Sequence, residues 1–320
     1  MSKFRVLVSD PIAPQGVELL KQSGIIEVDV KTGLSPDQFN AIIGDYDALL
    51  VRSMTKVKAE SFGFAKKLKV IGRAGAGVDN VDVPAATANG TLVMNTPGGN
   101  NNAVAELALG YLFALARKLT EANQSTKSGK WEKSKFLGVE LQGRTLGVVG
   151  LGAIGKIVAR KAQALGMKVV AYDPQLTAAQ AGELGVQLLE LPALLALADA
   201  VTLHVPLLAT TRGWFDAKIL GQMKKGAWLI DAARGGIVVE ADLLQALESG
   251  QVGAAALDVF AQEPTPADNP LLAHPRVLCT PHIGASTVEA QDNVGIQIAE
   301  QVVRYLRDGI VENAVNQPVR

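Results

Sequence analysis

The amino-acid sequence predicts an α/β protein with two doubly wound parallel sheets. Three observations support this fold class. Two series of short β-branched runs alternate with helix-like stretches, a glycine-rich turn follows the first run of the second series, and the 320 residues exceed what one ordinary core holds. At about 150 residues for each domain, the length predicts two domains, and we expect a cleft between them.

The first series occupies residues 1–97. Helical stretches are expected near residues 14–23, 36–43, 58–67 and 83–89, and they separate the strand-like runs "FRVLVSD", "IEVDV", "ALLVRS", "LKVIGRA" and "TLVMNTP". Strands that alternate with helices predict a parallel sheet with crossover connections.

The second series begins near Thr145. Its runs are "TLGVVG", "MKVVAYD", "AVTLHVP", "AWLIDAA", "AAALDVF" and "RVLCTP". Long helices are expected on either side of it, at residues 101–117 and 286–307. Their placement predicts that a Rossmann domain, residues 98–285, is inserted into a discontinuous flavodoxin-like domain, residues 1–97 and 286–320, with the two helices as the hinge.

Composition narrows the class of protein. With 31 basic and 31 acidic residues and 48% hydrophobic residues, the chain resembles a soluble globular protein without electrostatic attraction to nucleic acid or to a membrane. The single cysteine, Cys279, excludes a disulfide framework and a multi-cysteine zinc site, so we expect a cytoplasmic protein without a metal. Neither a secretion signal nor a membrane-spanning segment is expected.

The stretch "TLGVVGLGAIGKIVARKAQALGMKVVAYDP" predicts a dinucleotide site. Gly150, Gly152 and Gly155 form G-x-G-x-x-G between a strand-like run and an amphipathic helix. These glycines permit a tight turn, close approach of the pyrophosphate and close packing of helix on strand. The start of the helix, with Ala153 and Ile154, offers free N–H groups to the phosphates.

Asp173 ends the next strand-like run. Its carboxylate would accept hydrogen bonds from the ribose hydroxyls of the cofactor and repel a 2′-phosphate. Pro174 and Gln175 follow it, with no adjacent Arg or Lys to hold such a phosphate. The sequence therefore predicts NAD as the cofactor, in a domain of residues 98–285.

Three further segments follow strand-like runs, and the carboxyl ends of such strands bind ligands in doubly wound sheets. They are "DAARGG" with Arg234, "LDVFAQEP" with Glu263 and "TPHIGAST" with His282. Alcohol oxidation needs a base for the hydroxyl proton, and histidine suits that task. Taken singly, His282 could be structural, Glu263 a solvated loop acid and Arg234 part of an ion pair at the start of a helix.

Other residues at the same strand ends complete the predicted cofactor site. His204, in "TLHVP", is expected to line the cofactor cleft, whereas His274 is expected in a surface turn. The remaining predicted cofactor contacts are Pro206, Ala233 and Asp258.

A series of motifs, in order, covers nearly the whole chain: "VRSMTKV", "GRAGAGVDNVD", "VMNTPGGN", "GLGAIG", "AARGGIV", "ALDVFAQEP" and "PHIGAST". On these motifs the chain resembles the NAD-dependent D-2-hydroxyacid dehydrogenases, and within them most closely the D-3-phosphoglycerate dehydrogenases. The resemblance implies that His282 is the acid/base, Glu263 its partner, and Arg234 the anchor of the substrate's carboxylate and carbonyl.

A phosphorylated three-carbon acid has two anionic ends, and Arg234 can hold only one of them. Arg52 and Arg73 end strand-like runs of the first domain, and the turn after Arg73, with Gly75 and Gly77, can form a nest of N–H groups for an anion. Surface solvation is the alternative for both arginines.

The resemblance implies substrate contacts for Arg52, Arg73 and Asn100, and it places Lys133 where a neighbouring subunit would contribute an arginine. The chain departs from the resemblance at Asn101, Asn102 and Ala103, where serines are usual, and at Asp231, where Asn is common. It also ends without the regulatory domain of many relatives, so we expect a short form or a trimmed chain.

The leading hypothesis is NAD-dependent oxidation of D-3-phosphoglycerate to 3-phosphohydroxypyruvate, which belongs to serine biosynthesis. The alternatives are another short substrate, such as glyoxylate or hydroxypyruvate, and an NAD-binding corepressor like the C-terminal binding proteins. The polar stretch of residues 125–143, "STKSGKWEKSKFLGVELQG", is expected to be a loop that joins subunits in a homodimer or a dimer-based homotetramer.

Overall fold

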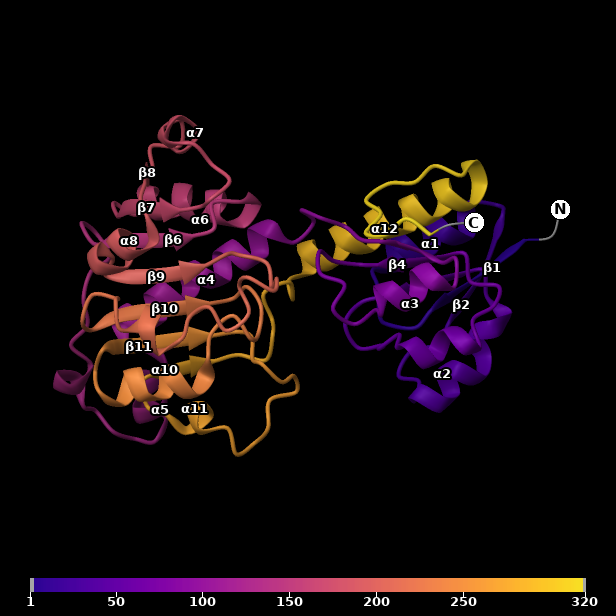
Figure 1. Ribbon diagram of the computed structural model, residues 1–320. Helices are drawn as coiled ribbons and strands as arrows, with labels where there is room; N and C mark the ends of the chain where they lie inside the picture. Colours follow the sequence, from indigo (N-terminus) through magenta and orange to yellow (C-terminus); the bar gives the residue numbers. More distant parts are fainter. Residues whose placement is uncertain (1–2, 319–320) are drawn as a thin grey trace. The chain divides into compact units, whose positions relative to one another are not determined.

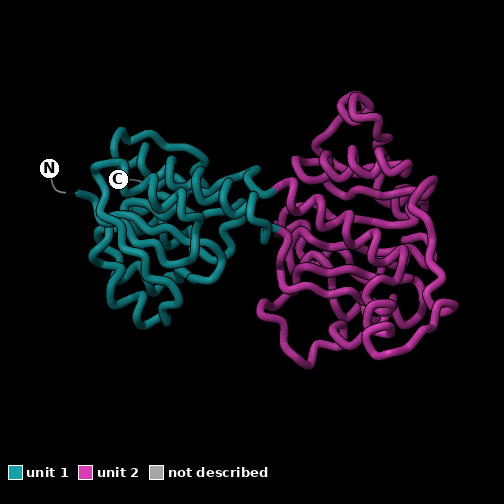
Figure 2. Tube along the Cα trace, turned by 180° about the vertical axis from the view of Figure 1, so that it is seen from behind, with its two compact units in different colours: residues 1–100, 285–320 teal, residues 101–284 magenta. Residues whose placement is uncertain are grey.

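The computed structural model describes residues 3–318. The chain forms two compact units, which Figure 2 colours separately. Unit 1 comprises residues 1–100 and 285–320, and unit 2 comprises residues 101–284. The sequence had divided the chain after residue 97 and after residue 285.

Unit 1 contains a five-stranded parallel sheet in the order β2-β1-β3-β4-β5. This is the flavodoxin-like order 2-1-3-4-5 that the sequence predicts. The strands are β1 (Phe4–Val8), β2 (Ile26–Val30), β3 (Ala48–Val51), β4 (Val70–Arg73) and β5 (Leu92–Met94) (Figure 1).

Helices cover both faces of this sheet. One face packs against α1 (Pro14–Gln22) and α12 (Val288–Asp308), and the other against α2 (Pro36–Ile42) and α3 (Val83–Ala88). Because the strands are buried on both faces, successive residues alternate between two apolar layers: Val6 and Val8 face α1 and α12, whereas Leu7 faces the opposite layer. Two short 3₁₀ turns, η1 (Ile43–Asp45) and η2 (Ala59–Gly63), complete the unit.

Unit 2 contains a seven-stranded parallel sheet in the order β12-β11-β10-β9-β6-β7-β8. Counted from β6, the first six strands in chain order, β6 to β11, lie in the Rossmann order 3-2-1-4-5-6, and β12 is added beyond β11. The predicted fold class is therefore confirmed for both units. The strands are β6 (Thr145–Val149), β7 (Lys168–Tyr172), β8 (Gln187–Leu188), β9 (Ala200–Leu203), β10 (Ala227–Asp231), β11 (Val252–Leu257) and β12 (Val277–Cys279).

The helices of unit 2 also form two layers. One apolar layer includes residues of α4 (Asn101–Arg117), α6 (Ala153–Ala164) and α7 (Ala178–Gly182). The other includes residues of α8 (Leu191–Leu197), α9 (Ala217–Leu220), α10 (Glu240–Glu248) and α11 (Pro270–Ala273). Neither the helix α5 (Leu119–Lys127) nor the 3₁₀ turn η3 (Lys133–Phe136) contains a buried residue.

Three local predictions differ from the structure. The helix expected over residues 58–67 is only the turn η2, which ends at Gly63, a poor helix former. The loop expected over residues 125–143 begins inside α5, because an exposed polar helix leaves no apolar period in the sequence. The two-residue edge strand β8 was not expected. Within residues 3–318, no helix combines the length and the apolar character needed to cross a membrane.

Candidate functional site

The predicted glycine turn links β6 to α6 in unit 2. Gly150 has a φ of 91°, and a Cβ there would lie 2.5 Å from the carbonyl oxygen of His204. A Cβ at Gly155 would lie 2.1 Å from the carbonyl oxygen of Gly150. Only glycine fits at these two positions, since the turn, α6 and the end of β9 approach one another so closely.

Gly152 differs from its two neighbours in the motif. Nothing lies within 4 Å of the place that its Cβ would occupy, and it is the N-cap residue of α6 without any side-chain cap. The first N–H groups of α6, which begins with Ala153 and Ile154, therefore adjoin open space at the positive end of a helix. This arrangement fits the pyrophosphate of a dinucleotide.

Asp173 follows β7 and is half-buried. Its Oδ2 accepts a hydrogen bond from the backbone N–H of Leu151 at 2.9 Å, and its Oδ1 accepts one from Gln175 at 2.9 Å. The carboxylate thus holds the end of β7 beside the glycine turn. Each oxygen keeps acceptor capacity for a ribose hydroxyl.

His204 follows β9, and the exposed Pro206 lies two residues beyond it. Nε2 of His204 lies 3.0 Å from Oγ1 of Thr202, while Nδ1 of His204 is buried without a hydrogen-bond partner among the described residues. Burial lowers the pKa of His204 to about 4, so the imidazole is neutral near pH 7. A buried ring nitrogen that lacks a partner next to the glycine turn also fits a ligand-binding edge.

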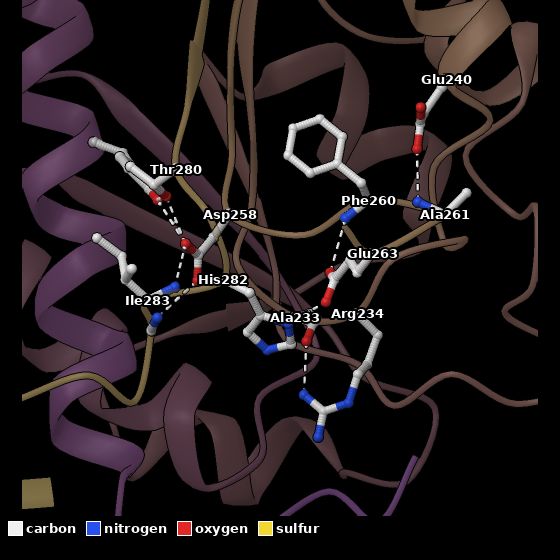
Figure 3. A network of polar contacts seen from close by, with 12 residues as sticks. Ala233, Arg234, Glu240, Asp258, Phe260, Ala261, Glu263, Thr280, His282 and Ile283 are labelled. Carbon is white, nitrogen blue, oxygen red and sulfur yellow. Dashed lines mark hydrogen bonds and ion pairs between the residues drawn. The ribbon is translucent and has the colours of Figure 1, made fainter. Parts of the chain in front are cut away.

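His282 and Glu263, which the sequence predicts as an acid/base and its partner, are in direct contact (Figure 3). Nδ1 of His282 lies 2.6 Å from Oε2 of Glu263, and Oε1 of Glu263 accepts a hydrogen bond from the N–H of Phe260 at 3.1 Å. The hydrogen bond to Glu263 raises the pKa of His282, and the nearby Arg234 guanidinium opposes this rise. The structure therefore brings His282, Glu263 and Arg234 together.

Arg234 lies in the loop after β10. Its Nη1 donates to the carbonyl oxygen of Ala233 at 2.7 Å. A Cβ at Gly235 would lie 1.8 Å from the carbonyl oxygen of Phe260, so the loops after β10 and β11 are in close contact. This contact fixes the backbone from which Arg234 projects against the backbone that carries Glu263.

The turn that carries His282 is held by the end of β11. His282 has a φ of 53°, a left-handed conformation that is costly for a residue with a side chain. Its N–H donates to the carbonyl oxygen of Asp258, and the Asp258 carboxylate accepts from the N–H groups of Ile283 at 2.8 Å and Gly284 at 2.7 Å. These bonds compensate for the strain and aim the imidazole.

The sequence assigned Asp258 to cofactor binding. The structure shows it 1% exposed, with Oδ1 also 2.5 Å from the Oγ1 donor of Thr280. Tyr111 of α4 contacts both Asp258 and Thr280 through its hydroxyl group. A cofactor contact by Asp258 stays a prediction, since the carboxylate is already engaged in positioning the turn.

Sequence reasoning missed the residues that support the site. Besides Thr280 and Tyr111, these residues include Glu240 of α10. Glu240 accepts a hydrogen bond from the N–H of Ala261 at 2.7 Å (Figure 3). It accepts another from Nδ2 of Asn269, also at 2.7 Å. Glu240 thereby anchors the loop that holds Glu263. No motif marks Tyr111 or Glu240, and "TPHIGAST" contains Thr280 without indicating its partner, because the partners of all three residues lie far away in the sequence.

In unit 1, Arg52 and Arg73 lie at the carboxyl ends of neighbouring strands, β3 and β4. The N–H of Arg52 donates to Oδ2 of the buried Asp10 at 2.7 Å, as do further groups of the loop at Met54 and Thr55. Asp10, which the sequence analysis also missed, therefore fixes the loop of Arg52.

The turn after Arg73 contains Gly75 and Gly77. The Arg73 guanidinium lies against Gly75, where a Cβ would meet Nη1, and the N–H of Gly75 donates to Oγ1 of Thr96 at 2.7 Å. Gly77 is half-buried farther along the turn. The predicted nest thus has one N–H that is already bound within the protein.

The other two predicted substrate residues, Asn100 and Lys133, lie outside the loops of Arg52 and Arg73. Asn100 is half-buried at the end of the first segment of unit 1, and its Oδ1 is buried without a hydrogen-bond partner among the described residues. Lys133 is exposed at the start of η3 in unit 2, and the structure contains a single chain, so a contact with a neighbouring subunit is not tested. Among residues 3–318 no group of three or more His, Cys, Asp or Glu side chains could hold a metal ion.

Comparison with known proteins agrees with this geometry. Residues 109–284 match the family model described as the NAD binding domain of D-isomer specific 2-hydroxyacid dehydrogenases. A D-3-phosphoglycerate dehydrogenase of Archaeoglobus fulgidus is 48% identical over 98% of this chain and 60% of its own length. This chain spans about three-fifths of the length of such curated relatives.

Solved structures extend the likeness to both units. The TT0316 protein of Thermus thermophilus is 36% identical, with a TM-score of 0.89 over 98% of this chain and 100% of that one. The NAD⁺-bound 3-phosphoglycerate dehydrogenase of Entamoeba histolytica is 28% identical, with a TM-score of 0.84 over 99% and 100%. The chain belongs to the D-isomer specific 2-hydroxyacid dehydrogenase family, and unit 2 contains the NAD-binding domain of that family.

Proposed function

We propose that the chain catalyses NAD-dependent oxidation of D-3-phosphoglycerate to 3-phosphohydroxypyruvate, a reaction of serine biosynthesis. The observation that carries the proposal is the His282–Glu263 pair with Arg234 beside it, at the carboxyl ends of strands in the same sheet as the glycine turn. The curated relatives that match nearly the whole chain are named for this activity.

The proton chemistry follows from the hydrogen bonds of His282. Because Nδ1 is bound to Glu263, Nε2 is the ring nitrogen left to take the hydroxyl proton of the substrate. Glu263 then stabilises the imidazolium that forms, as its effect on the pKa of His282 indicates. Arg234 would bind the substrate carboxylate through its planar fork. NAD, when bound, supplies the hydride acceptor.

The cofactor part of the proposal rests on the open space at Gly152. The residues proposed to hold NAD are Gly150, Gly152, Ala153, Ile154, Gly155, Asp173, His204, Pro206, Ala233 and Asp258. Gly152→Ala should fold normally, since its Cβ meets nothing, yet weaken NAD binding by roughly tenfold or more because the methyl group occupies the space next to α6. Calorimetric titration of NAD and a thermal melt measure both effects.

Gly155→Ala is the matched variant, since its Cβ would collide with the carbonyl oxygen of Gly150. It should lower the melting temperature as well as NAD affinity. Unchanged NAD affinity in Gly152→Ala would contradict the assignment of the cofactor to this turn.

The substrate part of the proposal rests on fixed positive charge in unit 1. Arg52 and Arg73 are proposed to bind the phosphate group, with contributions from Gly75, Gly77 and Asn100, and from Lys133 of a neighbouring subunit. Oδ1 of Asn100 is a buried acceptor without a hydrogen-bond partner among the described residues, and a substrate hydroxyl would satisfy it.

Steady-state kinetics test this choice. We expect kcat/KM for D-3-phosphoglycerate to exceed that for D-glycerate, and Arg52→Ala or Arg73→Ala to lower the former by roughly 10- to 100-fold with little effect on the latter. Equal losses for both substrates would reject the phosphate assignment. A preference for glyoxylate or hydroxypyruvate would favour the second candidate, and a glyoxylate reductase is indeed among the similar structures, at 30% identity.

We also propose a homodimer, or a tetramer built from dimers. Trp131 is 87% exposed and Leu137 is 83% exposed, and Gly138 packs against the backbone of α4 at Ala116. Leu119, at the start of α5, is exposed close to this contact. Large apolar side chains that are exposed in one stretch of the chain support an interface there. Sedimentation showing a monomer with full activity would contradict the proposed dimer.

A cytoplasmic location, proposed from the single cysteine, is checked by fractionation.

A further inference from the structure

Unit 2 gathers more acidic than basic groups at the ends of β10, β11 and β12. Asp231 and Asp258 end neighbouring strands, are 2% and 1% exposed, and are joined by a backbone hydrogen bond of 2.9 Å from the Asp258 N–H to the Asp231 carbonyl oxygen. Glu263 adds a third carboxyl group, while Arg234 is the permanent cation beside them. Glu263 is exposed and paired with His282, so Asp231 and Asp258 are two buried carboxyl groups beside one permanent cation, which favours protonation of one of them.

The hydrogen bonds indicate which carboxyl group takes the proton. Asp258 accepts from two backbone N–H groups and the Thr280 hydroxyl, and Glu263 is paired with His282. Asp231 accepts only from backbone N–H groups, that of Ala233 at 2.9 Å and that of Arg234, in the turn that carries the guanidinium. Burial raises the pKa of Asp231 to about 7, with a further rise from Asp258 and an opposing effect of Arg234.

We propose that Asp231 is a positioning residue that acts through Arg234: its buried carboxylate weakens the hold of the guanidinium on an anionic substrate, so that substrate affinity falls as the pH rises through neutrality. The inference rests on the proposed function only in taking Arg234 as the anchor of the substrate carboxylate. Deprotonation adds one negative charge next to that anchor and repels a second carboxylate.

The other groups around β10 do not produce this effect. At the end of β9, His204 stays neutral above about pH 5 because burial lowers its pKa to about 4. On α4, burial raises the pKa of Tyr111, so that hydroxyl stays neutral as well. Asp258, after β11, and Arg234, in the loop after β10, face Asp231, and His282, whose pKa the hydrogen bond to Glu263 raises, is a further titratable group near Arg234. The experiment must therefore separate Asp231 from His282.

Asp231→Asn makes that separation. Asparagine removes the charge and keeps an Oδ1 acceptor for one of the two backbone N–H groups, those of Ala233 and Arg234, that the carboxylate binds. With NAD saturating, the ratio of the wild-type KM to the variant KM for D-3-phosphoglycerate should be near one at about pH 6 and rise to roughly 3- to 10-fold at about pH 8.5. The kcat ratio should stay nearly constant, because titration of His282 and of the substrate is common to both proteins.

Asp268→Asn is the control, since it removes the same charge from an exposed position of unit 2. Its KM ratio should be flat across the same range. A flat ratio for Asp231→Asn, or a change confined to kcat, would overturn the proposal.

A second measurement does not depend on the reaction. Carboxyl ¹³C NMR of the wild-type protein with labelled aspartate should show one buried carboxyl group that titrates near neutrality, and Asp231→Asn should lack it. If the chain is inactive on D-3-phosphoglycerate but shows this titration, the proposed substrate is wrong and Asp231 is still the titrating group. An Asp231 carboxylate that stays ionised down to about pH 4 would overturn the inference whatever the substrate is.

Discussion

The carboxyl edges of the two sheets use the same device to hold their loops. In unit 1, the buried Asp10 after β1 accepts hydrogen bonds from N–H groups of the loop that follows β3 and from the Thr55 hydroxyl at 2.5 Å. In unit 2, the buried Asp258 after β11 accepts hydrogen bonds from the turn that follows β12 and from the Thr280 hydroxyl at 2.5 Å. Each aspartate fixes the backbone of a neighbouring loop that carries a candidate functional side chain, Arg52 or His282.

The two edges differ in the charges that these loops present. The loops of unit 1 carry Arg52 and Arg73, whose positive charge does not change with pH. The loops of unit 2 carry His282 and Glu263, and Asp231 adds a carboxyl group with a pKa of about 7. Fixed charge suits binding, whereas groups that exchange protons near neutrality suit chemistry. We therefore expect the phosphate group to bind at the edge of unit 1, and proton transfer to occur at the edge of unit 2, beside the proposed carboxylate anchor Arg234.

The largest effect expected from this division is on turnover. His282→Gln should lower kcat roughly 10²- to 10⁴-fold, since it removes the proposed general base, whereas Arg52→Ala should act mainly by raising KM. Steady-state kinetics on purified variants measure both constants. A large fall of kcat in Arg52→Ala, with unchanged KM, would erase the distinction between the two edges.

The two buried aspartates should have similar effects on stability and different effects on kinetics. Asp10→Asn and Asp258→Asn each remove a charged acceptor from several N–H donors, so each should lower the free energy of unfolding by about 2 to 3 kcal/mol in urea titrations. Asp258→Asn should then lower kcat through the His282 turn, and Asp10→Asn should raise KM through the Arg52 loop. The exposed Asp268→Asn should change neither stability nor kinetics.

The smallest effect concerns the pH profile of the acid–base pair. Glu263 raises the pKa of His282, so Glu263→Gln should move the acidic limb of kcat/KM for oxidation to lower pH. A histidine pKa raised by folding stabilises the protein below its unfolded value, about 6.5, and this contribution is lost as the pH rises through the folded value. With His282 48% exposed, that contribution should stay below about 1 kcal/mol. If the acidic limb does not move, Glu263 has no part in the proton transfer.

Local sequence was sufficient for the fold class and the glycine turn. Continuous apolar runs that alternate with helical stretches predict parallel sheets buried on both faces, and both observed sheets have that form. The G-x-G-x-x-G spacing predicts a turn in which Gly150 and Gly155 have no room for a side chain, and the structure shows the two contacts responsible. These features are readable because each depends on residues that are close together in the chain.

The tertiary structure decided how the functional side chains are held. Asp10 contacts a loop more than 40 residues away, and Tyr111 contacts Thr280 across 169 residues. Asp231 and Asp258 become neighbours only because β10 and β11 pair, and burial then raises the pKa of Asp231. A residue's burial and its charged neighbours depend on which strands lie side by side, and the sequence around it does not contain that information.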